Sequence, residues 1–194
     1  MPGKPSTITS NEETPTLIVQ PRRDKATVTG HGKPIVELID GVKIRELSTV
    51  ADYRGELTEM WNPDWNFDQG GVPYVYHVSC GPGSIRAWVV HLKQTDRLYY
   101  PSGRFQVVLY DARENSPTRG RVNELYFGAA KRALLLIPPG VYHGVRNAGS
   151  EEAWFVNMPS TPYCHDDPDK YRLPLDSPEI PFKFQSLEQA RLHV

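Results

Sequence analysis

A histidine at the end of an apolar segment is the first residue of this sequence that could carry out chemistry. The segment "SIRAWVVH", residues 84–91, is rich in Ile, Trp and Val and ends at His91. Histidine titrates near neutral pH, so it can take up or release a proton during a reaction. Because side chains alternate along a strand, we expect Val89 and His91 on the same face. The alternative is a structural histidine, hydrogen-bonded in the core.

A second histidine follows a turn. In "IPPGVYHGVRN", residues 137–147, Pro138 and Gly140 predict a sharp reversal of the chain. We expect His143 to begin the next strand, with its side chain pointing into the interior. An ordinary buried histidine is again the competing interpretation.

Short strands must position these two histidines. The chain has 194 residues, of which 18 are proline and 15 are glycine, and its apolar segments are short. Short apolar segments between turn residues predict an all-β sandwich or barrel. The expected strands are "PIVELI", "VKIREL", "GELTEMW", "PYVYHVSC", "SIRAWVVHL", "DRLYYPS", "RFQVVLYDA", "VNELYFG", "ALLLIP", "GVYHGVRN" and "AWFVNMP".

We expect one main domain, residues 31–185, between two different ends. Residues 1–30 are polar and rich in Pro, Ser and Thr, which predicts a flexible N-terminal arm. Residues 186–194 predict a short C-terminal helix, with Ser186 as its N-cap and Gln189 completing a capping box.

The composition argues against several classes of function. A net charge of −1 without a basic stripe gives no reason to expect nucleic acid as a partner. No apolar run is long enough to span a bilayer, and the first residues lack the apolar centre of a signal peptide. Cys80 and Cys164 lie too far apart to form a metal-binding or redox motif. These features favour a cytoplasmic protein with no membrane partner.

Five segments occur in the order and spacing of a known family. They are "DYRGELTE" (52–59), "PGSIRAW" (82–88), "VVLYDARENSPTRG" (107–120), "IPPGVYHGV" (137–145) and "DSPEIPF" (176–182). Together they resemble the dTDP-4-dehydrorhamnose 3,5-epimerase family over roughly residues 45–182, and the turn before His143 has the spacing of the second cupin motif.

This resemblance implies an all-β jelly-roll cupin barrel, a homodimer, and a nucleoside-diphosphate 4-keto-6-deoxysugar as substrate, in deoxysugar or polysaccharide biosynthesis. It implies neither a metal nor another cofactor. An epimerase of this family removes a proton next to the ketone and returns it to the opposite face. That chemistry requires a base, an acid, and a group that stabilises the oxyanion.

Three positions depart from the family pattern. Val89 stands where the family has its catalytic histidine, and Asn157 stands where it has its general-acid tyrosine. The family lysine that faces the oxyanion falls near Asp96 and Arg97. We therefore expect His91 to be the base.

The remaining catalytic roles are assigned by the same resemblance. Arg97 or Lys93 is expected to stabilise the oxyanion, and Asp176 to orient the base. Tyr163 is a candidate for the missing acid, because it lies in the polar, turn-rich stretch 158–174, which is long enough to cover a site.

The substrate-binding positions of the family are better retained. Arg54 and Glu59 match a segment whose arginine contacts the diphosphate, often across the dimer interface. Arg86 matches the arginine at the sugar-diphosphate end, and a guanidinium fork suits phosphate oxygens. His77 matches a histidine on the preceding strand, and we expect it and His143 to contact substrate as well.

Three alternatives remain open. Sugar-nucleotide 3,4-ketoisomerases are related small cupins whose Arg-Gly-x-His-x-His-x-Lys pattern is matched in part by Arg86, His91 and Lys93. A cupin that binds a sugar nucleotide without catalysis is the second alternative. The third is a metal-dependent cupin, but His91 and His143 would need a carboxylate such as Asp96 to join them, so we expect no metal.

Overall fold

The computed structural model describes residue 18 and residues 23–32 and 34–185. The arm expected over residues 1–30 lies largely outside these described residues. The helix expected over residues 186–194 lies outside them entirely.

Two compact units make up the chain, Met1–Glu37 and Leu38–Val194. In the first unit, Val28 and Pro34 form an isolated antiparallel bridge. The second unit contains every named strand. Among the described residues, no helix is long and apolar enough to cross a membrane.

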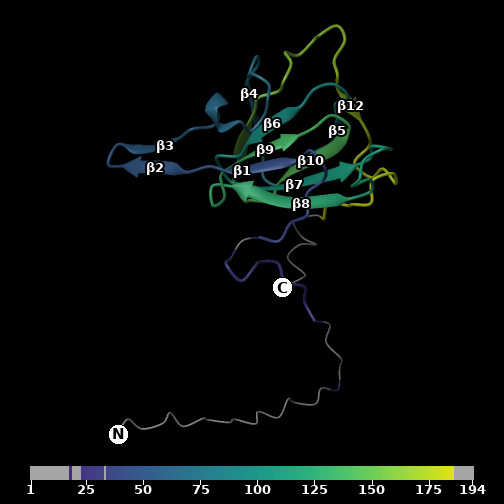
Figure 1. Ribbon diagram of the computed structural model, residues 1–194, viewed down its shortest axis with the longest axis horizontal. Helices are drawn as coiled ribbons and strands as arrows, with labels where there is room; N and C mark the ends of the chain where they lie inside the picture. The colour runs from purple at the N-terminus through teal and green to yellow at the C-terminus, as the bar shows by residue number, and fades with distance from the viewer. Residues whose placement is uncertain (1–17, 19–22, 33, 186–194) are drawn as a thin grey trace. The chain divides into compact units, whose positions relative to one another are not determined.

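The second unit is built on two five-stranded antiparallel sheets, with strand orders β1-β9-β6-β11-β4 and β12-β5-β10-β7-β8 (Figure 1). The first sheet comprises β1 (Lys43–Glu46), β9 (Ala133–Ile137), β6 (Asp96–Tyr99), β11 (Ala153–Asn157) and β4 (Tyr76–Cys80). The second comprises β12 (Tyr171–Arg172), β5 (Ile85–Val90), β10 (Val141–Asn147), β7 (Arg104–Asp111) and β8 (Val122–Gly128). The predicted all-β jelly-roll cupin fold is confirmed.

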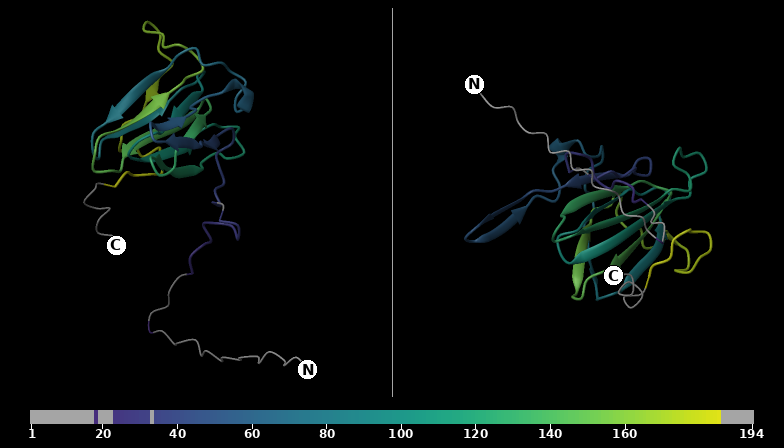
Figure 2. Two further views of the ribbon diagram at one scale, coloured as in Figure 1. Left: turned by 90° about the vertical axis from the view of Figure 1, so that its left-hand side faces the viewer. Right: turned by 90° about the horizontal axis from the view of Figure 1, so that it is seen from below.

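A separate hairpin of β2 (Thr49–Asp52) and β3 (Gly55–Thr58) projects away from the two sheets (Figures 1 and 2). It is followed by a single 3-10 turn, η1 (Pro63–Trp65), whose N-terminus is capped by the Asn62 side chain.

The expected strands from "VKIREL" onward each contain an observed strand, whereas "PIVELI" does not. In that segment the buried Ile39 donates its N–H to the Asn123 side chain at 2.8 Å, and Ile35 and Val36 are exposed. At Ile39 a side-chain partner has therefore replaced the expected strand pairing, and Pro34 at the start of the segment forms only an isolated bridge. The very short β12 was not expected either.

The core lies between the two sheets and is rich in aromatic rings. Tyr100 stacks on Phe127 with ring centroids 5.3 Å apart, and it also contacts Phe105 and Phe155. Phe155 also lines a cavity between the sheets, so packing in the core fixes part of the wall of that cavity.

Candidate active site

A cavity of about 320 Å³ opens between the two sheets. Its apolar wall includes Val78, Leu98 and Val145, which come from β4, β6 and β10. Its polar lining consists of Tyr76, Arg86, His91, Asp96, His143, Asn157, Lys170 and Arg172.

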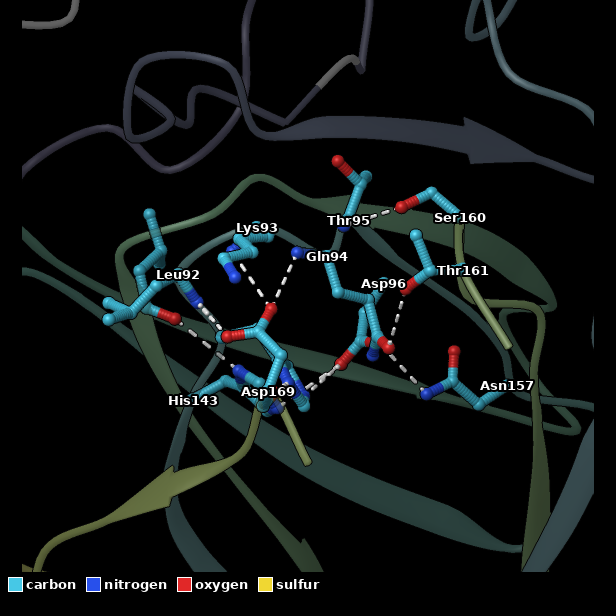
Figure 3. Close-up of polar contacts among 12 residues, drawn as sticks. Leu92, Lys93, Gln94, Thr95, Asp96, His143, Asn157, Ser160, Thr161 and Asp169 are labelled. Atoms are coloured by element: carbon cyan, nitrogen blue, oxygen red, sulfur yellow. Dashed lines mark hydrogen bonds and ion pairs between the residues drawn. The ribbon is translucent and has the colours of Figure 1, made fainter. Parts of the chain in front are cut away.

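Three of these side chains, His91, Asp96 and His143, form a buried cluster, and Figure 3 labels Asp96 and His143. His91 Nε2 lies 3.3 Å from Asp96 Oδ2, and His143 Nε2 lies 3.4 Å from the same oxygen. The two imidazole rings stack with centroids 5.7 Å apart. His91 and His143 are each 8% exposed and Asp96 is 2% exposed. The sequence analysis required a carboxylate to join the two histidines, and Asp96 does so.

The strands and one turn explain this convergence. Asp96 opens β6 and His143 is the third residue of β10, while His91 directly follows β5. The turn before β10 is tied to the end of β5, because Gly140 donates its N–H to the His91 carbonyl at 2.7 Å. Gly140 has φ +79°, a left-handed conformation that favours glycine.

The second carboxylate oxygen of Asp96 has its own partners. Gln94 Nε2 donates to Oδ1 at 2.7 Å, and Asn157 Nδ2 donates to it at 3.0 Å. Asn157 also donates to the Tyr76 hydroxyl oxygen at 2.9 Å. Oδ1 is thus satisfied by amides, which leaves Oδ2 to the two histidines.

The other ring nitrogen of each histidine faces a backbone carbonyl. His91 Nδ1 contacts the Asp169 carbonyl oxygen, and His143 Nδ1 lies 3.4 Å from that of Val141. Both nitrogens of each ring therefore have protein partners. His91 as placed has no free nitrogen to take a proton from a substrate, which does not favour its expected role as a lone base.

Burial and mutual charge set the protonation of the cluster. Burial by itself would raise the pKa of Asp96, but the neighbouring imidazoles of His91 and His143 lower that pKa to about 2. Burial lowers the pKa of His143. For His91 the effect of burial is outweighed by Asp96, and the pKa is raised. Asp96 is therefore anionic within the cluster, and its charge favours a cation beside it.

Asp169 holds the loop that carries His91. Its carboxylate accepts the N–H groups of Leu92, Lys93 and Gln94 at 2.9, 2.8 and 2.8 Å (Figure 3). Because its carbonyl also contacts the His91 ring, this one residue fixes both the backbone and the imidazole. Asp169 belongs to the turn-rich stretch 158–174.

Three exposed cations line the same cavity: Arg86, Lys170 and Arg172. Within the described part of the chain, none of them forms an ion pair. Burial, Arg172 and Arg86 together lower the pKa of Lys170. Like charges kept this close without carboxylate partners indicate a site for an anion.

Two expected catalytic residues lie elsewhere. Arg97 is on the face of β6 opposite to Asp96, where it pairs with Asp68 and donates to the Met158 carbonyl at 3.0 Å. It does not line the cavity, so the expectation that it stabilises an oxyanion there is not met. Asp176 is exposed, and the nitrogens of the His91 ring face Asp169 and Asp96 instead.

A second cavity, of about 230 Å³, adjoins the first through shared lining residues. Lys93 and Tyr163 line this second cavity, as does His91. Tyr163 is exposed and packs edge-on against His165. These two predicted residues therefore lie next to the cluster without joining it.

The predicted binding residues are divided between the cavity and the surface. Arg86 and His143 line the main cavity. Arg54 is at the tip of the β2–β3 hairpin, paired with Asp52 at 2.6 Å, and Glu59 follows the hairpin in an exposed position. His77 is exposed on the face of β4 opposite to Tyr76.

Sequence reasoning missed several residues of the site as functional candidates. Lys170 and Arg172 were not singled out, because nothing in a turn-rich stretch shows where its charges will fold. Asp96, by contrast, was named from the sequence as the carboxylate that could join the two histidines, and an aspartate that opens a buried strand is unusual. Tyr76 carries no distinguishing signal in the sequence, because it is one of ten tyrosines in the chain.

The chain resembles known proteins along most of its length. A family model described as dTDP-4-dehydrorhamnose 3,5-epimerase matches residues 37–191. The spore coat polysaccharide biosynthesis protein SpsL of Bacillus subtilis is 38% identical over 153 residues, which cover 77% of this chain and 98% of that protein. The probable low-salt glycan biosynthesis epimerase Agl13 of Haloferax volcanii is 36% identical over 139 residues, covering 71% and 89%.

Among solved structures, a dTDP sugar isomerase from Desulfovibrio desulfuricans G20 is similar in both sequence and fold. It is 33% identical and superposes with a TM-score of 0.69, covering 75% of this chain and 91% of that one.

Proposed function

The chain belongs to the dTDP-4-dehydrorhamnose 3,5-epimerase family, and on that basis we propose that it is an epimerase or isomerase of a nucleoside-diphosphate 4-keto-6-deoxysugar. The reaction removes a proton from a carbon next to the ketone and returns it. Because its relatives are named for glycan and spore coat polysaccharide biosynthesis, we assign the chain to polysaccharide biosynthesis.

One observation carries this proposal: a buried carboxylate between two imidazoles shares a cavity with three cations that have no carboxylate partner among the described residues. The cations Arg86, Lys170 and Arg172 suit a diphosphate, whose oxygens bind guanidinium and ammonium groups. The cluster is then available to the sugar, at the point where charge develops on the ketone oxygen.

The catalytic roles differ from a single histidine base. Because both nitrogens of His91 are engaged, we assign it to the cluster, which holds the ketone end of the sugar. The proton carriers are then Tyr76 and Lys170, the titratable side chains that line the cavity outside the cluster and are not arginines. Lys93 and Tyr163 remain candidates from the second cavity.

We also propose a cytoplasmic homodimer in which the β2–β3 hairpin contacts the partner. The hairpin exposes Val50, Tyr53 and Leu57, which are 69%, 97% and 64% exposed. An isolated two-stranded hairpin is marginally stable in water. In a dimer, Arg54 at its tip would be carried toward the partner's cavity, as the family pattern implies for diphosphate binding.

Exchange with solvent tests the proposed reaction. When the protein is incubated in D₂O with dTDP- and GDP-linked 4-keto-6-deoxysugars, proton NMR should show loss of a C3 or C5 proton signal. The product distinguishes the reactions, because epimerisation inverts a carbon and ketoisomerisation moves the ketone. If no sugar exchanges although the nucleotide binds, the chain is a non-catalytic sugar-nucleotide-binding cupin.

Arg86→Ala tests the anion site. A charge-assisted contact is worth about 1.5–3 kcal/mol, so losing it should weaken dTDP binding at least about tenfold in calorimetry. Arg104→Ala is the matched control, because Arg104 is exposed over the Tyr126 ring and does not line the cavity. If Arg86→Ala and wild type bind dTDP equally well, Arg86 does not contact the diphosphate.

A further inference from the structure

We infer that His91, Asp96 and His143 bind a divalent transition-metal ion. Their ligand atoms all lie within 4.8 Å of one another, and each comes from a buried side chain. Two imidazoles and one carboxylate are a donor set that suits zinc and its first-row neighbours.

The distances fit a shared ion better than direct hydrogen bonds. A charge-assisted N–H···O bond is about 2.7–2.9 Å long. The two Nε2–Oδ2 distances are 3.3 and 3.4 Å. Ligands held about 2.0–2.2 Å from a tetrahedral zinc ion lie about 3.4 Å apart, so both separations match the edges of a zinc tetrahedron.

The hydrogen bonds behind the rings point the right atoms at the ion. A carbonyl oxygen only accepts, so the Nδ1 atoms that face the Asp169 and Val141 carbonyls are the protonated ones in neutral rings. The lone pairs of both Nε2 atoms then point toward Asp96 Oδ2. With neutral rings, three electron-rich atoms therefore face one buried point, an arrangement that suits a cation between them.

The surrounding contacts are those of a metal site. Metal-binding histidines characteristically donate their second nitrogen to a carbonyl or carboxylate, and binding carboxylates are themselves hydrogen-bonded. Here the histidines face carbonyls, and Asp96 Oδ1 accepts from Gln94 and Asn157. Protein contacts thus hold all three side chains in place, and the cluster is open only toward the cavity.

The ligand set is open, as in catalytic rather than structural zinc sites. Val89, the register partner of His143, lines the cavity where a fourth protein ligand could have stood. The remaining coordination position therefore faces the space that would hold substrate.

The role of the ion rests on the proposed function, whereas its binding does not. Bound to the ketone oxygen, the ion would accept the charge that develops there as the neighbouring C–H bond breaks. The electron pair would move to the ketone oxygen and the proton to the uncharged amine of Lys170, because Tyr76 keeps its phenol proton. Tyr76 would then donate its proton to the opposite face of that carbon, and proton transfer from Lys170 to Tyr76 through solvent would restore both groups without any redox change.

Metal titration of the untagged, chelator-treated full chain tests the site without substrate. We expect calorimetry to show one high-affinity Zn²⁺ ion per chain. Co²⁺ should give the strong visible absorption of a four-coordinate site with nitrogen ligands. Asp96→Asn and His143→Gln should each weaken Zn²⁺ binding by more than about 100-fold, since losing even a supporting partner costs about 10–100-fold. His77→Gln, on the outer face of β4, is the control and should bind like wild type.

Val89→His supplies a test that does not depend on variants that lose a ligand. It adds an imidazole opposite His143, and Zn²⁺ should bind more tightly than in wild type. The inference is overturned if folded wild-type protein binds neither Zn²⁺ nor Co²⁺, or if Asp96→Asn and His143→Gln bind as well as His77→Gln. Zn²⁺ binding without sugar exchange would instead refute the proposed function alone, and exchange by a protein that binds no metal would refute this inference alone.

Discussion

At the scale of single residues, the proposed reaction would use Tyr76 in place of the acid that the family carries at another position. Asn157, at the family's tyrosine position, is the register partner of Tyr76 and donates to its hydroxyl oxygen at 2.9 Å. The phenol proton is therefore free to point into the cavity. Burial raises the pKa of Tyr76, which keeps the phenol protonated at neutral pH.

Tyr76→Phe should therefore slow turnover and leave binding intact. A positioned proton donor contributes about 10²–10⁴-fold to rate, so kcat should fall in that range while dTDP affinity is unchanged. Steady-state kinetics and calorimetry measure the two. Tyr126→Phe is the control, because that hydroxyl binds Glu124 on the exposed side of β8. Unchanged kcat in Tyr76→Phe would give the acid role to Lys170 or Tyr163.

The sequence predicted some residues of the site and could not predict others, for a physical reason. Arg86 and His143 lie on strands and His91 directly follows one, so alternation and register fix the direction of their side chains, and all three line one cavity. Lys170 and Asp169 reach the site from an irregular stretch whose path depends on tertiary contacts. Asp176 was assigned by resemblance, but Asp169 and Asp96 hold the histidine instead.

At the scale of elements, the turn before β10 shows how local sequence fixes the site. Gly140→Ala should destabilise the fold by about 1–3 kcal/mol, because a left-handed conformation is costly for alanine. The added Cβ would also lie 2.8 Å from Cγ of Arg113, which pairs with Asp111. Urea unfolding measures the loss.

The matched control for that turn is Gly71→Ala, since a Cβ there meets nothing within 4 Å and Gly71 does not have a positive φ. It should stay close to wild type. If both variants unfold at the same urea concentration, the turn does not depend on the conformation of Gly140.

Strands were easier to predict than their limits. Strongly apolar segments such as "ALLLI" became β9 because both faces of that strand are buried. The two-residue β12 pairs with Val89 and Val90 on β5, so the neighbouring strand, and not its own sequence, creates it. "PIVELI" has the composition of a strand, yet its buried Ile39 binds the Asn123 side chain.

At the scale of the whole molecule, the projecting hairpin argues for assembly. Val50 and Leu57 are paired in register on β2 and β3, so their exposed side chains form one apolar face. Arg54 is two residues beyond β2, at the tip. In the described chain, β2 and β3 pair only with each other. We therefore expect a second copy of the chain to cover their apolar face.

The double variant Val50→Lys, Leu57→Glu should therefore convert a dimer into a monomer, because it places charges on the face that the partner would cover. Analytical ultracentrifugation at micromolar concentration measures this change. Leu175→Glu is the control: Leu175 is 46% exposed outside the hairpin, and this variant should remain dimeric.

If Arg54 reaches the partner's cavity, the monomeric variant should also bind dTDP more weakly, and Arg54→Ala should match that loss while staying dimeric. A monomeric wild type would refute the homodimer, and a double variant that stays dimeric would place the interface on another surface.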